Sequence, residues 1–313
     1  MDNRRLSSSS ASLLVLLWAG FLLLMQLLSG YLTPKMTAGW QQYLWTGIVE
    51  LAFLLVPLAF VCRATGRKAF SPLRTFPAGE GISVLLAAGL ALASYPVMLL
   101  LQNLWILLLE MMGATPQGVT LPEIKGPVEL VLALLSVAGA AAFAEELCLR
   151  GILMPALRGR MGPMAAAVLT AAIFALMHGS FSALPYTFLL GWLMGYLALR
   201  SHTVYPAMAF HLANNALATL ISYGAMGVQT EQINAELTPI LRLQSILILG
   251  NLALVAAALM AVLLYFYRRV TPGPQPIPRE ERTPFWWAPM AAGAAVFALL
   301  VISSALVEFS IGG

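Results

Sequence analysis

Long runs of apolar residues, separated by short polar stretches, follow one another from residue 11 to residue 309. A helix needs about 20 apolar residues to cross the hydrocarbon core of a bilayer, and the runs are of about this length or longer. The pattern therefore predicts nine membrane-spanning helices. They cover residues 11–32, 43–63, 81–112, 127–158, 163–182, 184–200, 203–224, 243–267 and 285–309. The first run could instead be a cleaved signal peptide, but it exceeds the usual apolar length of about 7–15 residues, and no small-x-small cleavage site is evident.

The composition agrees with this pattern. Hydrophobic residues make up 60% of the chain and charged residues only 10%, whereas soluble domains carry about 25% charged residues. The fold class predicted is all-α, a polytopic transmembrane helical bundle. The net charge of +4 does not indicate nucleic acid as a partner, because the basic residues lie between the apolar runs, which is a membrane-topology pattern.

The positions of the basic residues predict the orientation of the chain. With the N-terminus in the cytoplasm and nine crossings, most of them fall on the cytoplasmic side, as the positive-inside rule requires. These are Arg4, Arg5, Arg63, Arg67, Lys68, Arg74, Arg158, Arg160, Arg200, Arg268, Arg269, Arg279 and Arg282, against Lys35, Lys125 and Arg242 outside. Short loops and the lack of a soluble domain favour a multi-pass protein of a bacterial inner (plasma) membrane.

The domain organisation predicted is a single integral membrane domain over residues 1–313. Within it, we expect a catalytic core at about 127–224, inside a framework of 81–267. A Pro-rich connector over 268–284 leads to an additional C-terminal helix at 285–309.

Two acids and a base interrupt the fourth apolar run, at Glu145, Glu146 and Arg150. A charge at the centre of a membrane helix costs on the order of 2.5–3.5 kcal/mol, so such residues indicate a functional site and need partners. Glu146 and Arg150 are four residues apart and share a helix face, with the acid in the favourable N-terminal position. Glu145 is rotated by about 100° and is free for chemistry.

Two of the three histidines lie within apolar runs. His178 shares a helix face with Phe174, whose ring is expected to wall one side of it, and His211 shares a face with Asn215. Glu145 and His178 lie about 22–26 Å from the turn that joins their helices, so they can meet. A carboxylate near a neutral histidine can hold and deprotonate a water. A second histidine and an amide can stabilise an oxyanion. A buried polar network that only locks helices together is the alternative.

These residues form three ordered motifs: Glu145-Glu-x-x-x-Arg150, Phe174-x-x-x-His178 and His211-x-x-x-Asn215. The motifs resemble those of the CAAX protease and bacteriocin-processing (CPBP) family of intramembrane proteases, which includes the type II CAAX prenyl endopeptidases. The resemblance implies a glutamate-type endopeptidase that hydrolyses peptide bonds of membrane-associated proteins or peptides. Glu145 and His178 would activate water, and His211 and Asn215 would form the oxyanion site. Glu146, Arg150 and Phe174 would support them.

Other chemistries stay open at this point. Glu145, His178 and His211 could instead be three Zn²⁺ ligands of a metalloprotease, although no metal is expected because no helix carries a His-x-x-x-His pair. A dyad of Cys148 and His178 is conceivable, although buried cysteine is more often inert. A non-catalytic membrane scaffold of the same fold is a further alternative. The oligomeric state is not predicted.

The side of the membrane on which the site opens is a separate expectation. Arg150, Arg158 and Arg160 lie on the cytoplasmic side of Glu145. They could attract the C-terminal carboxylate of a substrate. The sequence thus predicts a cytoplasmic mouth and a protein or peptide substrate with a hydrophobic or lipidated end.

Overall fold

A computed structural model of the chain describes residues 6–73, 76, 79–117, 122, 124–225, 239–275, 277, 280 and 283–311. The described residues form helices and connecting loops. The longer helices are α1 (Ser8–Leu32), α2 (Gly39–Ala64), α3 (Glu80–Met111), α7 (Pro163–Met177), α8 (Leu184–Ser201), α9 (Tyr205–Ala225), α11 (Pro239–Val270) and α12 (Ala288–Ile311). Short 3₁₀ turns, η1 (Thr33–Lys35) and η2 (Ser71–Leu73), follow α1 and precede α3.

The fourth predicted helix is composite. It consists of α4 (Pro127–Ala133), η3 (Leu134–Ala140), α5 (Ala141–Glu146), η4 (Leu147–Leu153) and α6 (Met154–Leu157). Both η3 and η4 are π-helical, so the prediction of regular α-helical spacing through this run is corrected. Such turns are rare and occur often at functional sites.

The all-helical class is confirmed, and so is the multi-pass membrane character. Within the described residues, six helices are long and apolar enough to span a bilayer: Ser8–Lys35, Gly39–Ala64, Glu80–Met111, Pro127–Leu157, Gln244–Val270 and Ala288–Ile311. The predicted runs 163–182, 184–200 and 203–224 form helices but do not meet this criterion. In particular α7 has only 15 residues, or about 22 Å, and is too short to span a core of about 30 Å.

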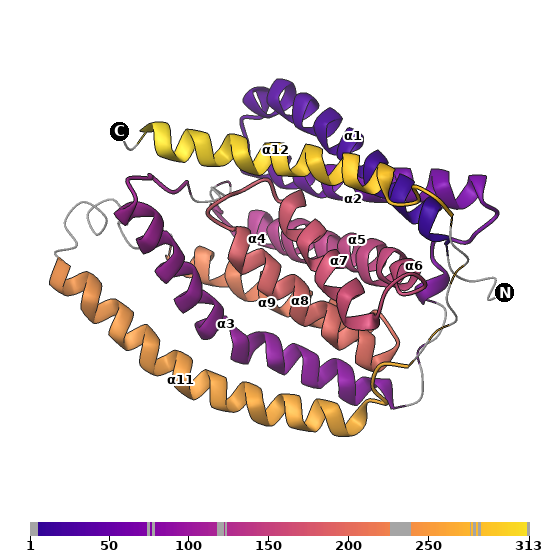
Figure 1. Ribbon diagram of the computed structural model, residues 1–313. Coiled ribbons are helices and arrows are strands. Elements are labelled where there is room, and N and C mark those ends of the chain that lie inside the picture. The colour runs from indigo at the N-terminus through magenta and orange to yellow at the C-terminus, as the bar shows by residue number, and fades with distance from the viewer. Residues whose placement is uncertain are drawn as a thin grey trace.

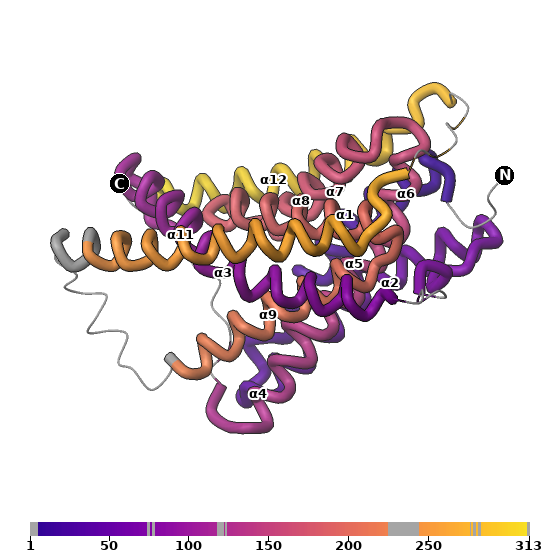
Figure 2. Tube along the Cα trace, turned by 90° about the horizontal axis from the view of Figure 1, so that it is seen from below, coloured from indigo at the N-terminus to yellow at the C-terminus, as the bar shows by residue number. Residues whose placement is uncertain are grey.

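The composite fourth helix and α7, α8 and α9 lie in the middle of the bundle. Figure 1 shows α3 and α11 together on one side of this group, and α1 and α12 together on the other. Figure 2, turned by 90°, also shows α11 running close to α3. The motif-bearing helices are therefore covered on both sides by helices that carry none of the three motifs.

One end of the bundle carries most of the described arginines and is called the basic end below. Arg160 donates to Ser8 Oγ at 2.8 Å, and Arg158 donates to the carbonyl of Gln275 at 2.6 Å. Arg200 donates to Thr271 Oγ1 at 3.0 Å. The described part of the connector between α11 and α12 is thus attached to this end. Five basic residues predicted to share this side lie outside the described residues: Arg4, Arg5, Arg74, Arg279 and Arg282. The side chain of Arg242, predicted for the other side, lies outside them as well.

Candidate active site

A cavity of about 400 Å³ lies inside the bundle, between α2, η3, α5, α7, α8 and α9. It brings together all four residues that the sequence assigned to catalysis. Its lining contains Thr46, Glu50, Ser136, Val137, Ala141, Glu145, Phe174, His178, Ala183, Tyr186, Thr187, Leu190, Met194, Phe210, His211, Asn214 and Asn215. This space is called the catalytic cavity below. Glu146 and Arg150 are not part of its lining and lie behind it.

The predicted pair of Glu146 and Arg150 is confirmed. Arg150 Nη1 lies 2.7 Å from Glu146 Oε1, and both side chains are fully buried. Arg150 Nη2 also donates to the carbonyl of Gly191 on α8 at 2.7 Å. A side chain at Gly191 would place its Cβ 2.8 Å from Phe174 Cδ1. Glycine therefore allows α8 to approach closely enough for its carbonyl to accept this hydrogen bond.

His211 connects the two glutamates. Its Nδ1 donates to Glu146 Oε1 at 2.9 Å, and its Nε2 lies 3.5 Å from Glu145 Oε2. Glu146 therefore accepts from both Arg150 and His211, and it fixes the ring of His211 in the way that a carboxylate orients the histidine of a hydrolytic triad. This second contact of Glu146 was not predicted from the sequence.

His178 is an exposed residue that lines the catalytic cavity at the end of the short helix α7. The helix ends at Met177, and His178 is its C-cap. His178 Nδ1 contacts the carbonyl of Phe174 at 2.8 Å. A carbonyl only accepts, so Nδ1 carries the proton and Nε2 is left as an acceptor, which is the state needed for a base. The Phe174 ring walls His178 as predicted, with ring centroids 4.7 Å apart.

The loop between α7 and α8 is hydrogen-bonded to α3 and α12 through its backbone. Trp105 Nε1 donates to the carbonyl of Phe181 at 3.3 Å, and Gln102 Nε2 donates to that of Ser182 at 2.9 Å. The N–H of Phe181 donates to Ser304 Oγ on α12 at 3.2 Å. Non-helical backbone at membrane depth is tolerated only where it is buried in protein or lines a cavity, and this loop fulfils that condition. α3 and α12 thereby fix the loop that follows His178.

Asn215 has one of its two amide N–H groups occupied. Its Nδ2 donates to the carbonyl of Val137 in η3 at 3.0 Å, while its Oδ1 accepts from Asn214 Nδ2 at 3.1 Å. Asn214 is buried, and its Nδ2 also lies 3.3 Å from Tyr186 Oη. The second N–H of Asn215 is left for the cavity. Asn214 and Tyr186 were not predicted as site residues, because a single amide or phenol in an apolar run gives little signal.

Glu50 on α2 is the most important residue that the sequence analysis missed. Its carboxyl group interacts with that of Glu145, and its Oε1 is buried and accepts no hydrogen bond. Gly47 permits this approach, since a Cβ there would lie only 3.1 Å from Ser136 Cβ on η3. An acid inside the second apolar run was a usable signal, by the same argument that singled out Glu145.

Part of the cavity lining lies away from the basic end, and the expected mouth on the cytoplasmic side stays a prediction. The lining includes Thr46 near the start of α2, and Ala183 and Tyr186 at the start of α8. These helix starts lie at the end of the bundle opposite the basic end. Arg150 cannot attract a substrate carboxylate, because it is buried and both ends of its guanidinium are engaged.

The alternative chemistries can be compared with the geometry. Among the residues that the structure describes, no group of three or more His, Cys, Asp or Glu side chains is arranged to hold a metal ion. The alternative of Zn²⁺ held by Glu145, His178 and His211 stays open. Cys148 is fully buried, and its thiol lies 3.8 Å from the carbonyl of Leu54. That contact directs the thiol toward α2, so it does not support the dyad of Cys148 and His178.

Fold and site together define a helical membrane protein with carboxylates, histidines and amides gathered in an internal cavity. The model of the family described as Type II CAAX prenyl endopeptidase Rce1-like matches residues 127–217. This match covers all three motifs, confirms the predicted resemblance to the CAAX protease and CPBP family, and supports a protease function of that type. Neither a search of curated proteins nor a search of solved structures gave a match.

Proposed function

We propose that this protein is an intramembrane endopeptidase that hydrolyses peptide bonds in membrane-associated proteins or peptides. The observation that carries the proposal is the convergence of Glu145, His178, His211 and Asn215 on one cavity inside the bundle. These residues come from three separate helices, and their chemical roles are complementary.

The geometry suggests how the reaction proceeds. Glu145 Oε2 is buried and accepts no hydrogen bond, so it can take a proton from a water held by Nε2 of His178. The water oxygen bonds to the scissile carbonyl carbon, and the carbonyl oxygen becomes an oxyanion. The free N–H of Asn215 stabilises that oxyanion, as does His211, which needs a proton on Nε2 as well as on Nδ1 to donate to it. The carbon–nitrogen bond then breaks, and protonated Glu145 returns its proton to the leaving amine.

The substrate and location follow from the surroundings of the cavity. A site enclosed by membrane helices requires a protein or peptide that is itself membrane-associated. The short loops favour a bacterial inner membrane with the N-terminus in the cytoplasm. In that orientation Thr46, Ala183 and Tyr186 of the cavity lining lie toward the outer face, which favours exported or membrane-tethered peptides as substrates. The proposed core of 127–224 within 81–267 needs α2 as well, since Thr46 and Glu50 line the cavity.

A direct test uses hydrolysis in ¹⁸O-water. The purified full chain in liposomes, incubated with a library of membrane-tethered peptides, should release products whose new carboxylate carries one ¹⁸O. His178→Ala should slow this release by about 10²–10⁴-fold, because it removes the acceptor nitrogen that positions water. His202→Ala is the matched control, since that ring contacts the carbonyl of Gly273 at the basic end. If no peptide gains ¹⁸O with the wild-type chain, the proposal is wrong.

We further propose that hydrolysis needs no bound metal. Protein purified without a histidine tag should remain active and should contain much less than one metal ion per chain by elemental analysis. The reason is that the described residues lack a preformed ligand group. About one Zn²⁺ per chain, lost together with activity in His211→Ala, would make Glu145, His178 and His211 ligands and would favour the metalloprotease alternative.

A further inference from the structure

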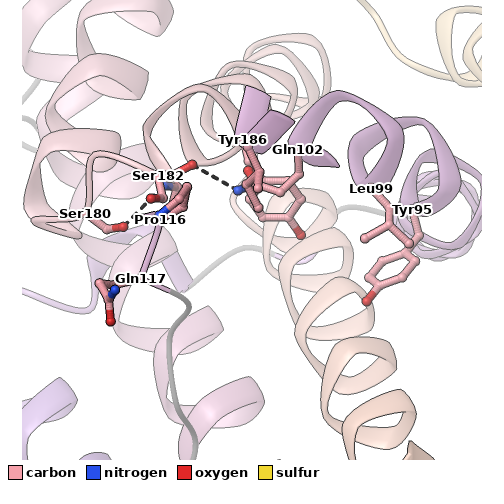
Figure 3. A pocket seen from close by; sticks show the side chains of 10 residues that line it. Tyr95, Leu99, Gln102, Pro116, Gln117, Ser180, Ser182 and Tyr186 are labelled. Carbon is pink, nitrogen blue, oxygen red and sulfur yellow. Dashed lines mark hydrogen bonds between the residues drawn. The ribbon is translucent and has the colours of Figure 1, made fainter. Parts of the chain in front are cut away.

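A second cavity, of about 450 Å³, adjoins the catalytic cavity. It lies between one face of α3, the loop that follows α3, and the loop between α7 and α8, as Figure 3 shows. The lining residues are Tyr95, Leu99, Gln102, Ile106, Pro116, Gln117, Ser180, Ser182, Ala183 and Tyr186. Ala183 and Tyr186 also line the catalytic cavity, so the two spaces share a wall.

The walls of this second cavity are mostly apolar, with a few polar groups at fixed positions. Leu99, Ile106 and Pro116 supply apolar surface. Gln102 supplies the most telling polar atom. Its Nε2 donates to the carbonyl of Ser182 at 2.9 Å, which sets the orientation of the amide. The other end of the amide is therefore Oε1, and that atom is buried without a hydrogen-bond partner. A buried acceptor without a donor is costly, and it requires an explanation.

Two elements fix the position of Gln102 Oε1. One is α3, which carries Gln102, and the other is the loop between α7 and α8, whose Ser182 carbonyl accepts from the same amide. The loop between α7 and α8 is bound to α12, because Ser182 Oγ donates to Glu308 Oε2 at 2.6 Å. Glu308 is itself buried and accepts a second hydrogen bond from Ser304. The second cavity thus has a preorganised wall next to the loop that carries His178, and such preorganisation is typical of binding sites.

We propose that the second cavity is the subsite for one apolar side chain of the peptide substrate, close to the bond that is cleaved, and that Gln102 Oε1 accepts a backbone N–H of that peptide. This inference rests on the proposed function. A peptide satisfies both features of the cavity, because it carries an apolar side chain and an amide donor together. A prenyl or acyl chain would fill the apolar part but has no N–H to offer Gln102.

Binding tests the inference without requiring turnover. The full-length Glu145→Gln chain in nanodiscs is titrated with fluorescent membrane-tethered peptides that differ only in Leu or Ala at single positions. At one position we expect Leu to bind roughly 10-fold or more tightly than Ala. Leu99→Trp should remove that preference by filling the cavity. Leu104→Trp is the matched control, because Leu104 is similarly exposed on α3 (43%, against 38% for Leu99) but does not line the cavity.

A second comparison isolates the hydrogen bond. N-methylation of the peptide at the amide near the preferred Leu should weaken binding several-fold in the Gln102 chain and should have no such effect in Gln102→Leu. Equal binding of Leu and Ala peptides at every position, or a preference unchanged by Leu99→Trp, would overturn the inference. Displacement of the peptide by free prenyl alcohol would overturn it in favour of a lipid subsite. If no ¹⁸O is incorporated but the Leu preference in binding is intact, the proposed hydrolysis is wrong and the subsite stands.

Discussion

Replacing Glu145 by glutamine should abolish peptide-bond hydrolysis, with a fall in rate of about 10²–10⁴-fold. Glutamine keeps the size of the side chain and its place beside His211, but it cannot accept the proton of water. The readout is ¹⁸O incorporation into products from membrane-tethered peptides, measured for wild-type and variant chains in the same liposomes.

The control for this variant is Glu129→Gln, a carboxylate in the first turn of α4 that does not line the catalytic cavity. It should hydrolyse peptides at the wild-type rate. Thermal melts of Glu145→Gln should show a folded protein, since the variant also relieves the interaction between the neighbouring carboxyl groups of Glu50 and Glu145. Equal rates for Glu145→Gln and wild type would remove Glu145 from the mechanism.

The helical class could be predicted because the apolar runs alone determine it. Their lengths identified a multi-pass membrane protein. The same signal overstated the length of one helix, because the apolar run 163–182 looks long enough to span although α7 stops at Met177. Hydropathy does not reveal where a helix ends when the next residues are buried in a loop. That early end makes His178 the C-cap of α7, where it lines the catalytic cavity.

The candidate site was predicted in part. Glu145, Glu146, Arg150 and the two membrane histidines stand out because an ionisable residue in an apolar run needs partners. The π-helical turns on both sides of α5 could not be predicted, since nothing in the local residue types demands them. The contribution of α2 depends on a close helix contact at Gly47, which only the assembled bundle reveals.

The catalytic roles assigned to Glu145, His178, His211 and Asn215 remain predictions. The geometry adds one link that helical periodicity could not provide, because it joins residues on different helices. Glu146 pairs with Arg150 on its own helix and with His211 on α9. A residue interpreted as mainly structural is therefore also the group that orients a proposed catalytic ring.

Breaking the pair of Glu146 and Arg150 should have the largest effect on stability. Arg150→Met should lower the free energy of unfolding by about 3–5 kcal/mol, because it leaves a carboxylate uncompensated inside the bundle. Glu146→Gln should cost a similar amount by leaving the buried guanidinium unpaired. The double variant should lose clearly less than the sum of the two single losses, since no charge then remains unpaired. Unfolding in mixed micelles titrated with SDS measures these differences.

Two further comparisons separate the structural contribution of Glu146 from its contact with His211. Arg269→Met is the matched control for Arg150→Met, because Arg269 is exposed and donates to Tyr265 on its own helix. It should change stability by less than about 0.5 kcal/mol. The double variant with Gln at 146 should regain stability relative to Glu146→Gln without regaining its hydrolysis rate, since glutamine restores no negative charge beside His211. Additive losses of stability would mean that Glu146 and Arg150 do not interact, and a regained rate would mean that Glu146 acts only through Arg150.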